Sequence, residues 1–377
     1  MLKLFIALIL LLAIGPADSQ EAAPVDTNDP GRLWIEVRYG NDLIQEQQFS
    51  EARDVLSSTL EALENVYGKD SAELASTIIL LSDATGALGK QRQQKKLHKR
   101  ALKLVSARYG KSSTEYAHAK LAVGMSLMRF GGNSKAGLSS VEDAYTIYSQ
   151  NPESSSQQFG DAALIVGNNY LARGKTEDAH RYYVRAHQVY SDMPDADEQR
   201  LAYAALNLAK TYLDQEYYED AEFYYEQALD LLDADNPATQ EDRLQAHAGL
   251  LVTYFLDGRS QTSGEPCVAI RALSADPSIP RAPPGKGAAP GQPINRVAPV
   301  YPASMIRLRK EGHVDFLFDV DEKGLVRSPS IIQVEGHTDF VAPAVKAVCR
   351  FTYSPKIVDG QPVATEGVKT RISFRFE

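Results

Sequence analysis

Small and aromatic residues recur along the middle of the chain with a period of about 42 residues. The segment from Gly167 to Ala186 carries Gly, Tyr and Ala at fixed spacings, and Ala209, Tyr212 and Tyr225 take the equivalent positions one period later. Only small side chains let two helices cross closely, so the pattern predicts stacked helix pairs with aromatic rings between them. The predicted repeat array covers residues 32–275, as five repeats and part of a sixth.

A different pattern begins near the C-terminus, where apolar and polar residues alternate. Val314, Phe316, Phe318 and Val320 share one face of a predicted strand. The segment from Phe340 to Phe351 has helical spacing, and a final alternating strand follows. The residues of that last strand are Val368, Lys369, Thr370, Arg371, Ile372, Ser373, Phe374, Arg375 and Phe376. The sequence therefore predicts an all-α superhelix and then, at residues 298–377, a small α+β domain whose three-stranded antiparallel sheet packs on a helix.

The remaining segments have other compositions. Residues 1–19 contain a basic start, an eleven-residue apolar run and small residues before Gln20, which is typical of a signal peptide. A retained membrane anchor is the alternative, although that run spans only about 17 Å. Residues 20–31 are polar and predict disorder, and residues 276–297 form a linker rich in Pro and Gly.

Charge is distributed unevenly along the chain. The formal net charge of −9 argues against nucleic acid as a partner, because nucleic acid requires a concentrated basic surface. Residues 90–103 nevertheless carry seven basic residues and no acidic ones, whereas residues 192–243 carry fifteen acidic residues and three basic ones. Each run is expected to be a solvated helix face, with a binding patch as the alternative.

No motif for catalysis is found in the sequence. It contains no nucleophile elbow, phosphate loop or zinc-binding helix, and its seven histidines have no convincing ligand spacing. We therefore expect no enzymatic activity, catalytic residue, metal, cofactor or small-molecule substrate.

Two cysteines, Cys267 and Cys349, permit one disulfide in an exported chain. On its predicted helix, Cys349 lies opposite Phe340 and Ala344, so it points away from the core of its own domain. We expect a bridge between the last repeat and the C-terminal domain, with two free thiols as the alternative.

The period of the middle segment resembles that of tetratricopeptide repeats, in the longer form of kinesin-light-chain-type arrays. Such arrays leave a concave groove that suits a peptide or another protein's helix. The predicted groove residues are Met125, Asn168, Tyr203, Lys210 and Phe255. An unused groove is the alternative.

The C-terminal segment resembles the C-terminal domain of TonB-type energy transducers. The matching landmarks, in order, are Tyr301-Pro302, Gly312-x-Val314-x-Phe316, Val320-Asp321-x-x-Gly324, Ala344-x-x-Ala347, Phe351-x-Tyr353-x-Pro355, Gly360-x-Pro362-Val363 and Ile372-x-Phe374. Phe351 departs from the Trp that is usual in the family. The resemblance implies β-augmentation, in which the N-terminal peptide of an outer-membrane receptor pairs with the edge of Val368–Phe376.

Two functions follow from these resemblances. The first is a periplasmic TonB-like protein in energy-coupled transport across the outer membrane. Its last strand would bind TonB-dependent receptors, and its repeats would dock inner-membrane motor proteins or a conventional TonB. The alternative is a periplasmic adaptor whose TonB-like domain is structural or mediates self-association. The linker is short compared with the tether of a conventional TonB, which favours dependence on a partner.

Overall fold

The structure is a computed structural model that describes residues 29–151, 156–195, 197–259, 264–273, 292–359 and 361–376. It divides into two compact units, residues 1–108 and 109–377. The predicted signal peptide, residues 20–28 of the predicted disordered segment and residues 276–291 of the predicted linker lie outside the described residues. No helix in the described ranges is both long enough and apolar enough to cross a membrane.

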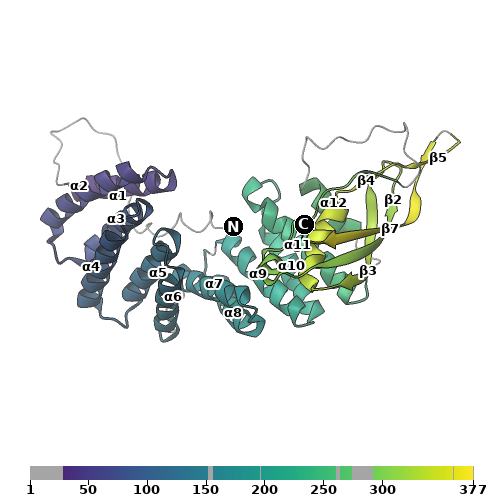
Figure 1. The fold of residues 1–377 in the computed structure, drawn as a ribbon. Helices are drawn as coiled ribbons and strands as arrows, with labels where there is room; N and C mark the ends of the chain where they lie inside the picture. The colour runs from purple at the N-terminus through teal and green to yellow at the C-terminus, as the bar shows by residue number, and fades with distance from the viewer. Residues whose placement is uncertain are drawn as a thin grey trace. The chain divides into compact units, whose positions relative to one another are not determined.

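The first unit consists of helix pairs. Its helices are α1 (Pro30–Gln45), α2 (Phe49–Tyr67), α3 (Ala75–Ala87) and α4 (Gln91–Tyr109) (Figure 1). The predicted disorder of residues 20–31 is wrong for its last residues, because α1 already begins at Pro30. Asp29 caps this helix by accepting hydrogen bonds from the backbone N–H groups of Gly31 and Arg32, and a proline fits the first helical position.

Helix pairs continue through the second unit. They are formed by α5 (Thr114–Arg129), α6 (Ser134–Ser149), α7 (Gln157–Ala172), α8 (Thr176–Ser191), α9 (Glu198–Asp214), α10 (Tyr218–Leu231), α11 (Gln240–Leu256) and the shorter α12 (Gly264–Leu273). Gly124 shows why the pattern needs small residues, because a Cβ there would lie 2.7 Å from the backbone oxygen of Gly137 on the partner helix. Tyrosines stack in the same repeating positions, as in the pair of Tyr212 and Tyr224 with ring centres 5.4 Å apart.

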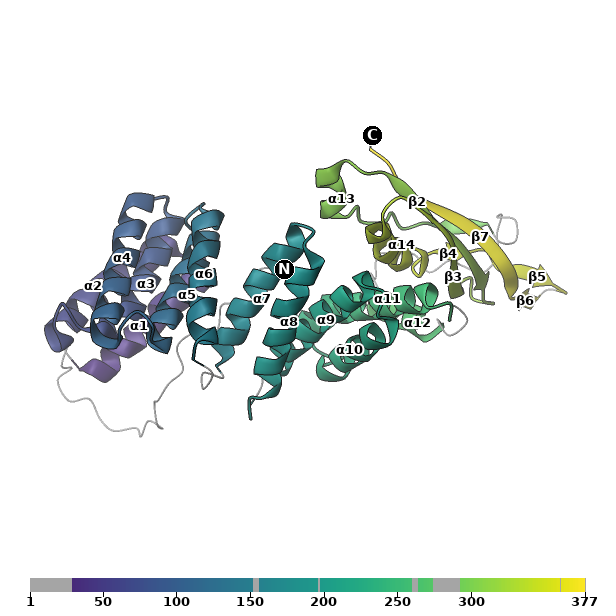
Figure 2. The ribbon, with the colours of Figure 1, turned by 90° about the horizontal axis from the view of Figure 1, so that it is seen from below.

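The C-terminal module, residues 292–376, combines short helices with a three-stranded antiparallel sheet, as predicted. Its elements are β1 (Pro293–Asn295), α13 (Ala303–Leu308), β2 (Gly312–Val320), β3 (Val326–Glu335), α14 (Val341–Val348), β4 (Thr352–Tyr353), β5 (Lys356–Val358), β6 (Gln361–Val363) and β7 (Thr365–Phe374). The strand order is β3-β2-β7, and α14 packs on the apolar face of β2 (Figure 2). The main sheet therefore has β3 at one edge and β7 at the other.

The module begins earlier than the sequence indicated. The predicted linker of residues 276–297 is wrong at its C-terminal end, because β1 pairs there with β4. Pro293 lies opposite Tyr353, and the backbone oxygen of Gln292 accepts a hydrogen bond from Ser354. These pairings satisfy backbone groups that the proline-rich composition had suggested would be solvated.

Two histidines, the buried His98 and the half-buried His247, lead to a prediction about pH. Burial lowers the pKa of His98 to about 4, and burial, with a smaller effect from Arg243, lowers the pKa of His247 to about 4. Between that value and the ordinary 6.5, the unfolded chain binds protons that the folded chain does not. The free energy of unfolding should therefore fall as the pH is lowered from 6.5 to about 4. Urea titrations across this range would measure the slope, and a His98→Gln variant should show a shallower one. Equal slopes would contradict the assignment.

Candidate functional site

Strand β7 forms one edge of the main sheet. It pairs antiparallel with β2 over the whole of β2, from Gly312 opposite Phe374 to Val320 opposite Thr365. Within the described ranges, no strand pairs with its other side. In an antiparallel strand, alternate residues direct both backbone polar groups to the same side. About half of the N–H and C=O groups of β7 therefore face an unpaired edge that can accept an extended segment.

The side chains of β7 alternate between the core and solvent. Thr370, Ile372 and Phe374 are buried, and they anchor the strand in the module. Lys369, Arg371 and Ser373 are exposed, and Val368 is half-buried. The predicted strand of residues 368–376 is wrong for its last two residues, because β7 ends at Phe374 and the exposed Arg375 and Phe376 follow it. The anchored side chains hold the open edge in an extended conformation, so a peptide that pairs with it meets a preformed template.

An ion pair fixes the exposed face of the sheet. Arg371 donates two hydrogen bonds to Asp315 on β2, with Nε–Oδ1 and Nη2–Oδ2 distances of 2.7 Å each. This bidentate contact lowers the pKa of Asp315 and raises that of Arg371. Because Lys369 and Arg375 are also exposed, the face beside the open edge is basic.

The C-terminal end of β7 is held by aromatic contacts. The Tyr301 ring lies 5.6 Å from that of Phe374 and 5.1 Å from that of Phe376. The Phe376 backbone N–H also donates to the Glu311 carboxylate at 2.8 Å. The Tyr-Pro landmark at residues 301–302 thus positions the end of the predicted docking strand.

The opposite side of the module is occupied by the last helix pair. Val345, Val348 and Cys349 form one continuous apolar cluster with Ala248 and Leu251 of α11, and this cluster extends to Ile270 of α12. Helix α14 is therefore buried on both sides, between the sheet and α11 (Figure 2). A salt bridge of 3.2 Å between Lys346 and Glu241 lies at the margin of the contact.

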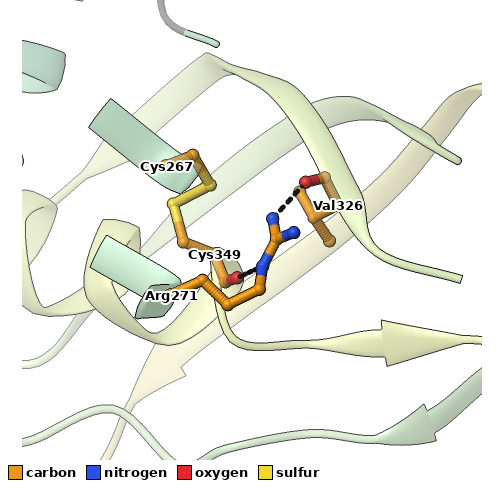
Figure 3. Close-up of a disulfide and its surroundings, with 4 residues drawn as sticks. All are labelled: Cys267, Arg271, Val326 and Cys349. Atoms are coloured by element: carbon orange, nitrogen blue, oxygen red, sulfur yellow. Dashed lines mark hydrogen bonds between the residues drawn. A yellow bond between two sulfur atoms is a disulfide. The ribbon is translucent and has the colours of Figure 1, made fainter. Parts of the chain in front are cut away.

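A disulfide crosses this contact. Cys267 of α12 is bonded to Cys349, with the two Cα atoms 5.3 Å apart, and both side chains are fully buried (Figure 3). Arg271, one turn after Cys267, donates hydrogen bonds to the backbone oxygens of Cys349 at 3.1 Å and Val326 at 2.5 Å. The bridge and the guanidinium together attach the module to the last repeat.

The predicted groove residues have different environments. Asn168 accepts a hydrogen bond from Tyr183 at 2.8 Å and donates one to Tyr203 at 3.5 Å, so it connects three successive helices. Lys210 is exposed. Met125 packs against the cluster of α5 to α8, and Phe255 packs against the apolar cluster that α11 shares with the module. The other four side chains are half-buried, so a ligand-binding role for these five residues stays a prediction.

Sequence reasoning missed two groups of polar residues. Arg271 carried no signal beyond its position on the same helix face as Cys267. The second group is a buried charge pair between Asp161 of α7 and Arg200 of α9, to which Tyr190 adds a hydrogen bond to Asp161 of 2.7 Å. Both groups connect different elements of the fold, which a pattern along one helix does not reveal.

The C-terminal module is similar to a known protein family. Residues 297–376 match the family model described as Gram-negative bacterial TonB protein C-terminal. The molecule thus combines a TonB-like domain with a helical repeat scaffold. The family match implies a location in the cell envelope and an interaction with outer-membrane receptors in general.

Other similarities concern the helical region or part of the chain. One similar solved structure is that of BtubC from P. vanneervenii, with 19% identity and a TM-score of 0.46; the match covers 68% of this chain and 96% of that one. Another is that of pilF from Pseudomonas aeruginosa, with 13% identity and a TM-score of 0.45; the match covers 65% of this chain and 92% of that one. A third is that of a signal-transduction ATPase with a tetratricopeptide repeat sensor from Pyrococcus horikoshii, with 17% identity and a TM-score of 0.48; the match covers 66% of this chain and 36% of that one. RxLR effector protein SFI4 of Phytophthora infestans is 27% identical over 162 residues, which are 42% of this chain, and the match spans about half of that relative's length.

The disulfide gives a prediction about stability. A chain with both Cys267→Ser and Cys349→Ser should lose about 2–4 kcal/mol of unfolding free energy, because the bridge closes a loop with a sequence separation of 82. Denaturant titration of the second unit's transition would measure the loss. Reductant should destabilise the parent protein and leave the double variant unchanged. Coincident transitions for parent and variant would show that the bridge contributes nothing.

Proposed function

We propose that this protein is an envelope adaptor that binds the N-terminal peptide of TonB-dependent outer-membrane receptors along the open edge of β7. The peptide would add a fourth strand to the main sheet, with backbone hydrogen bonds providing affinity and the flanking side chains providing selectivity. The observation that carries the proposal is the pairing of β7 with β2 alone within the described residues. The family match of the same segment supports it.

The attachment of the module affects how such an adaptor would act. The apolar contact with α11 and α12 and the Cys267–Cys349 bridge limit the distance that the module can travel from the repeats. We therefore propose that the protein contributes to energy-coupled transport through a partner, either inner-membrane motor proteins or a conventional TonB, docked on its repeats. In this proposal the protein is non-catalytic and lies in the periplasm, with a membrane tether if the apolar N-terminal segment is retained.

A second candidate function has its own supporting observation. The apolar cluster shared by α11, α12 and α14 covers the end of the repeat array, as a capping repeat would. The module would then be a structural cap of an adaptor, or a self-association edge, without a receptor ligand. The two candidates differ in what contacts β7 in cells.

Photo-crosslinking from the edge distinguishes them. A photoreactive residue at Ser373, which is exposed on β7, should capture a TonB-dependent receptor near its N-terminus, as identified by mass spectrometry. Ser373 is a better position than Ile372, whose side chain is only 4% exposed. Deletion of the strand is less informative, because it would remove Ile372 and Phe374 from the core.

The matched control uses the opposite edge. Gln333 is exposed on β3, in the same sheet, and the same photoreactive residue there should not capture the receptor. Capture of a second copy from Ser373 would instead support self-association. Equal yields of receptor from both positions, or none from Ser373, would count against the proposed docking edge.

A further inference from the structure

Helix α4 carries a stripe of basic side chains on its exposed face. Arg92, Lys96, Lys99 and Lys103 follow one another at spacings of four, three and four residues, which place them on one side of a helix. All four are exposed, and none forms a salt bridge within the described part of the chain. They form the basic stripe, about 16 Å long at 1.5 Å per residue. In a protein with a net charge of −9, an uncompensated cationic stripe needs a physical reason.

Helix α10 presents the complementary surface with the same spacing. Glu219, Phe223, Glu226 and Asp230 are exposed and lie four, three and four residues apart, and they form the acidic stripe. Phe223 is 59% exposed at a position between the carboxylates. Burial, followed by the neighbouring Glu222 and Asp230, raises the pKa of Glu226, so carboxylates are crowded here. An exposed aromatic ring between charges is typical of a surface that meets a partner.

We propose that the basic stripe of one molecule docks on the acidic stripe of a second copy of this chain, so that the protein associates head to tail. Because both stripes have spacings of four, three and four residues, the four positions of one stripe can align with the four positions of the other. The cationic side chains then face Glu219, Glu226 and Asp230, and one of them lies over the Phe223 ring as a cation–π contact. The two surfaces differ, so the interface is heterologous, and each copy keeps one free stripe for the next. The β7 edge takes no part in this contact.

The experiment measures mass in solution for the full-length protein. Light scattering and sedimentation at low ionic strength should give a mass that rises with concentration, and about 1 M salt should return it to the monomer, since the Debye length is then about 3 Å. The variant K96E/K99E should weaken association by about tenfold or more, and so should E226K/D230K. The control K111E/K135E changes the net charge as much as K96E/K99E does, at exposed lysines outside the stripe, and should associate like the parent.

Complementation separates this contact from any other self-association. The two stripe variants should each be monomeric alone and associate when mixed, because each native stripe then meets its native counterpart and each reversed stripe its reversed counterpart on the other variant. The fourfold variant, with both stripes reversed, should associate like the parent. If the stripe variants self-associate normally, or if their mixture stays monomeric, the proposal is overturned. It is also overturned if the parent is monomeric at every concentration and instead floats with phosphatidylglycerol vesicles through α4.

Discussion

The packing of α14 between the main sheet and helix α11 determines which surfaces of the C-terminal module stay accessible. A short helix with apolar residues on two sides cannot be stable with one side in water, so it requires a second layer, which the last helix pair provides. The same contact brings Cys349 next to Cys267 and places Arg271 against the backbone of β3. The β3 side of the module is therefore attached to the repeats, while β7 lies at the far edge of the sheet.

This arrangement bears on how a TonB-like module could act without a long tether. A module on a flexible chain reaches a distant ligand by diffusion of the tether, and the entropy of that tether reduces the affinity. Here the disulfide and the shared apolar cluster hold the module in a fixed orientation relative to α11 and α12, so it does not move on a tether. A fixed edge loses less conformational entropy when it binds an extended peptide, but the peptide must then reach the edge by its own diffusion. In the proposed function, transmission of force consequently belongs to the protein that docks on the repeats.

Sequence reasoning succeeded where the physical signal is local and periodic. The alternation from Val314 to Val320 predicted β2, and the spacing of small residues predicted helix pairs whose crossing is visible at Gly124. It was less successful where a residue's role depends on another part of the chain. The buried pair of Asp161 and Arg200 gave no periodic signal, because its two residues lie on different helices. The proline-rich residues before position 298 have the composition of a linker, and nothing in the sequence indicated that β1 among them pairs with the distant β4.

The position of Cys349 lies between these two cases. Its helical phase correctly separated it from Phe340 and Ala344, so an outward direction followed from the sequence. The sequence also predicted the bridge to Cys267, which the structure contains, and the second layer of helices leaves both cysteine side chains fully buried. Arg271 has the same origin: a guanidinium on the face of α12 that carries Cys267 has a role only once the backbone oxygens of Cys349 and Val326 are beside it. For a residue that joins two domains, the pattern of its own helix thus predicts where its side chain points, whereas its role follows only when both domains are known.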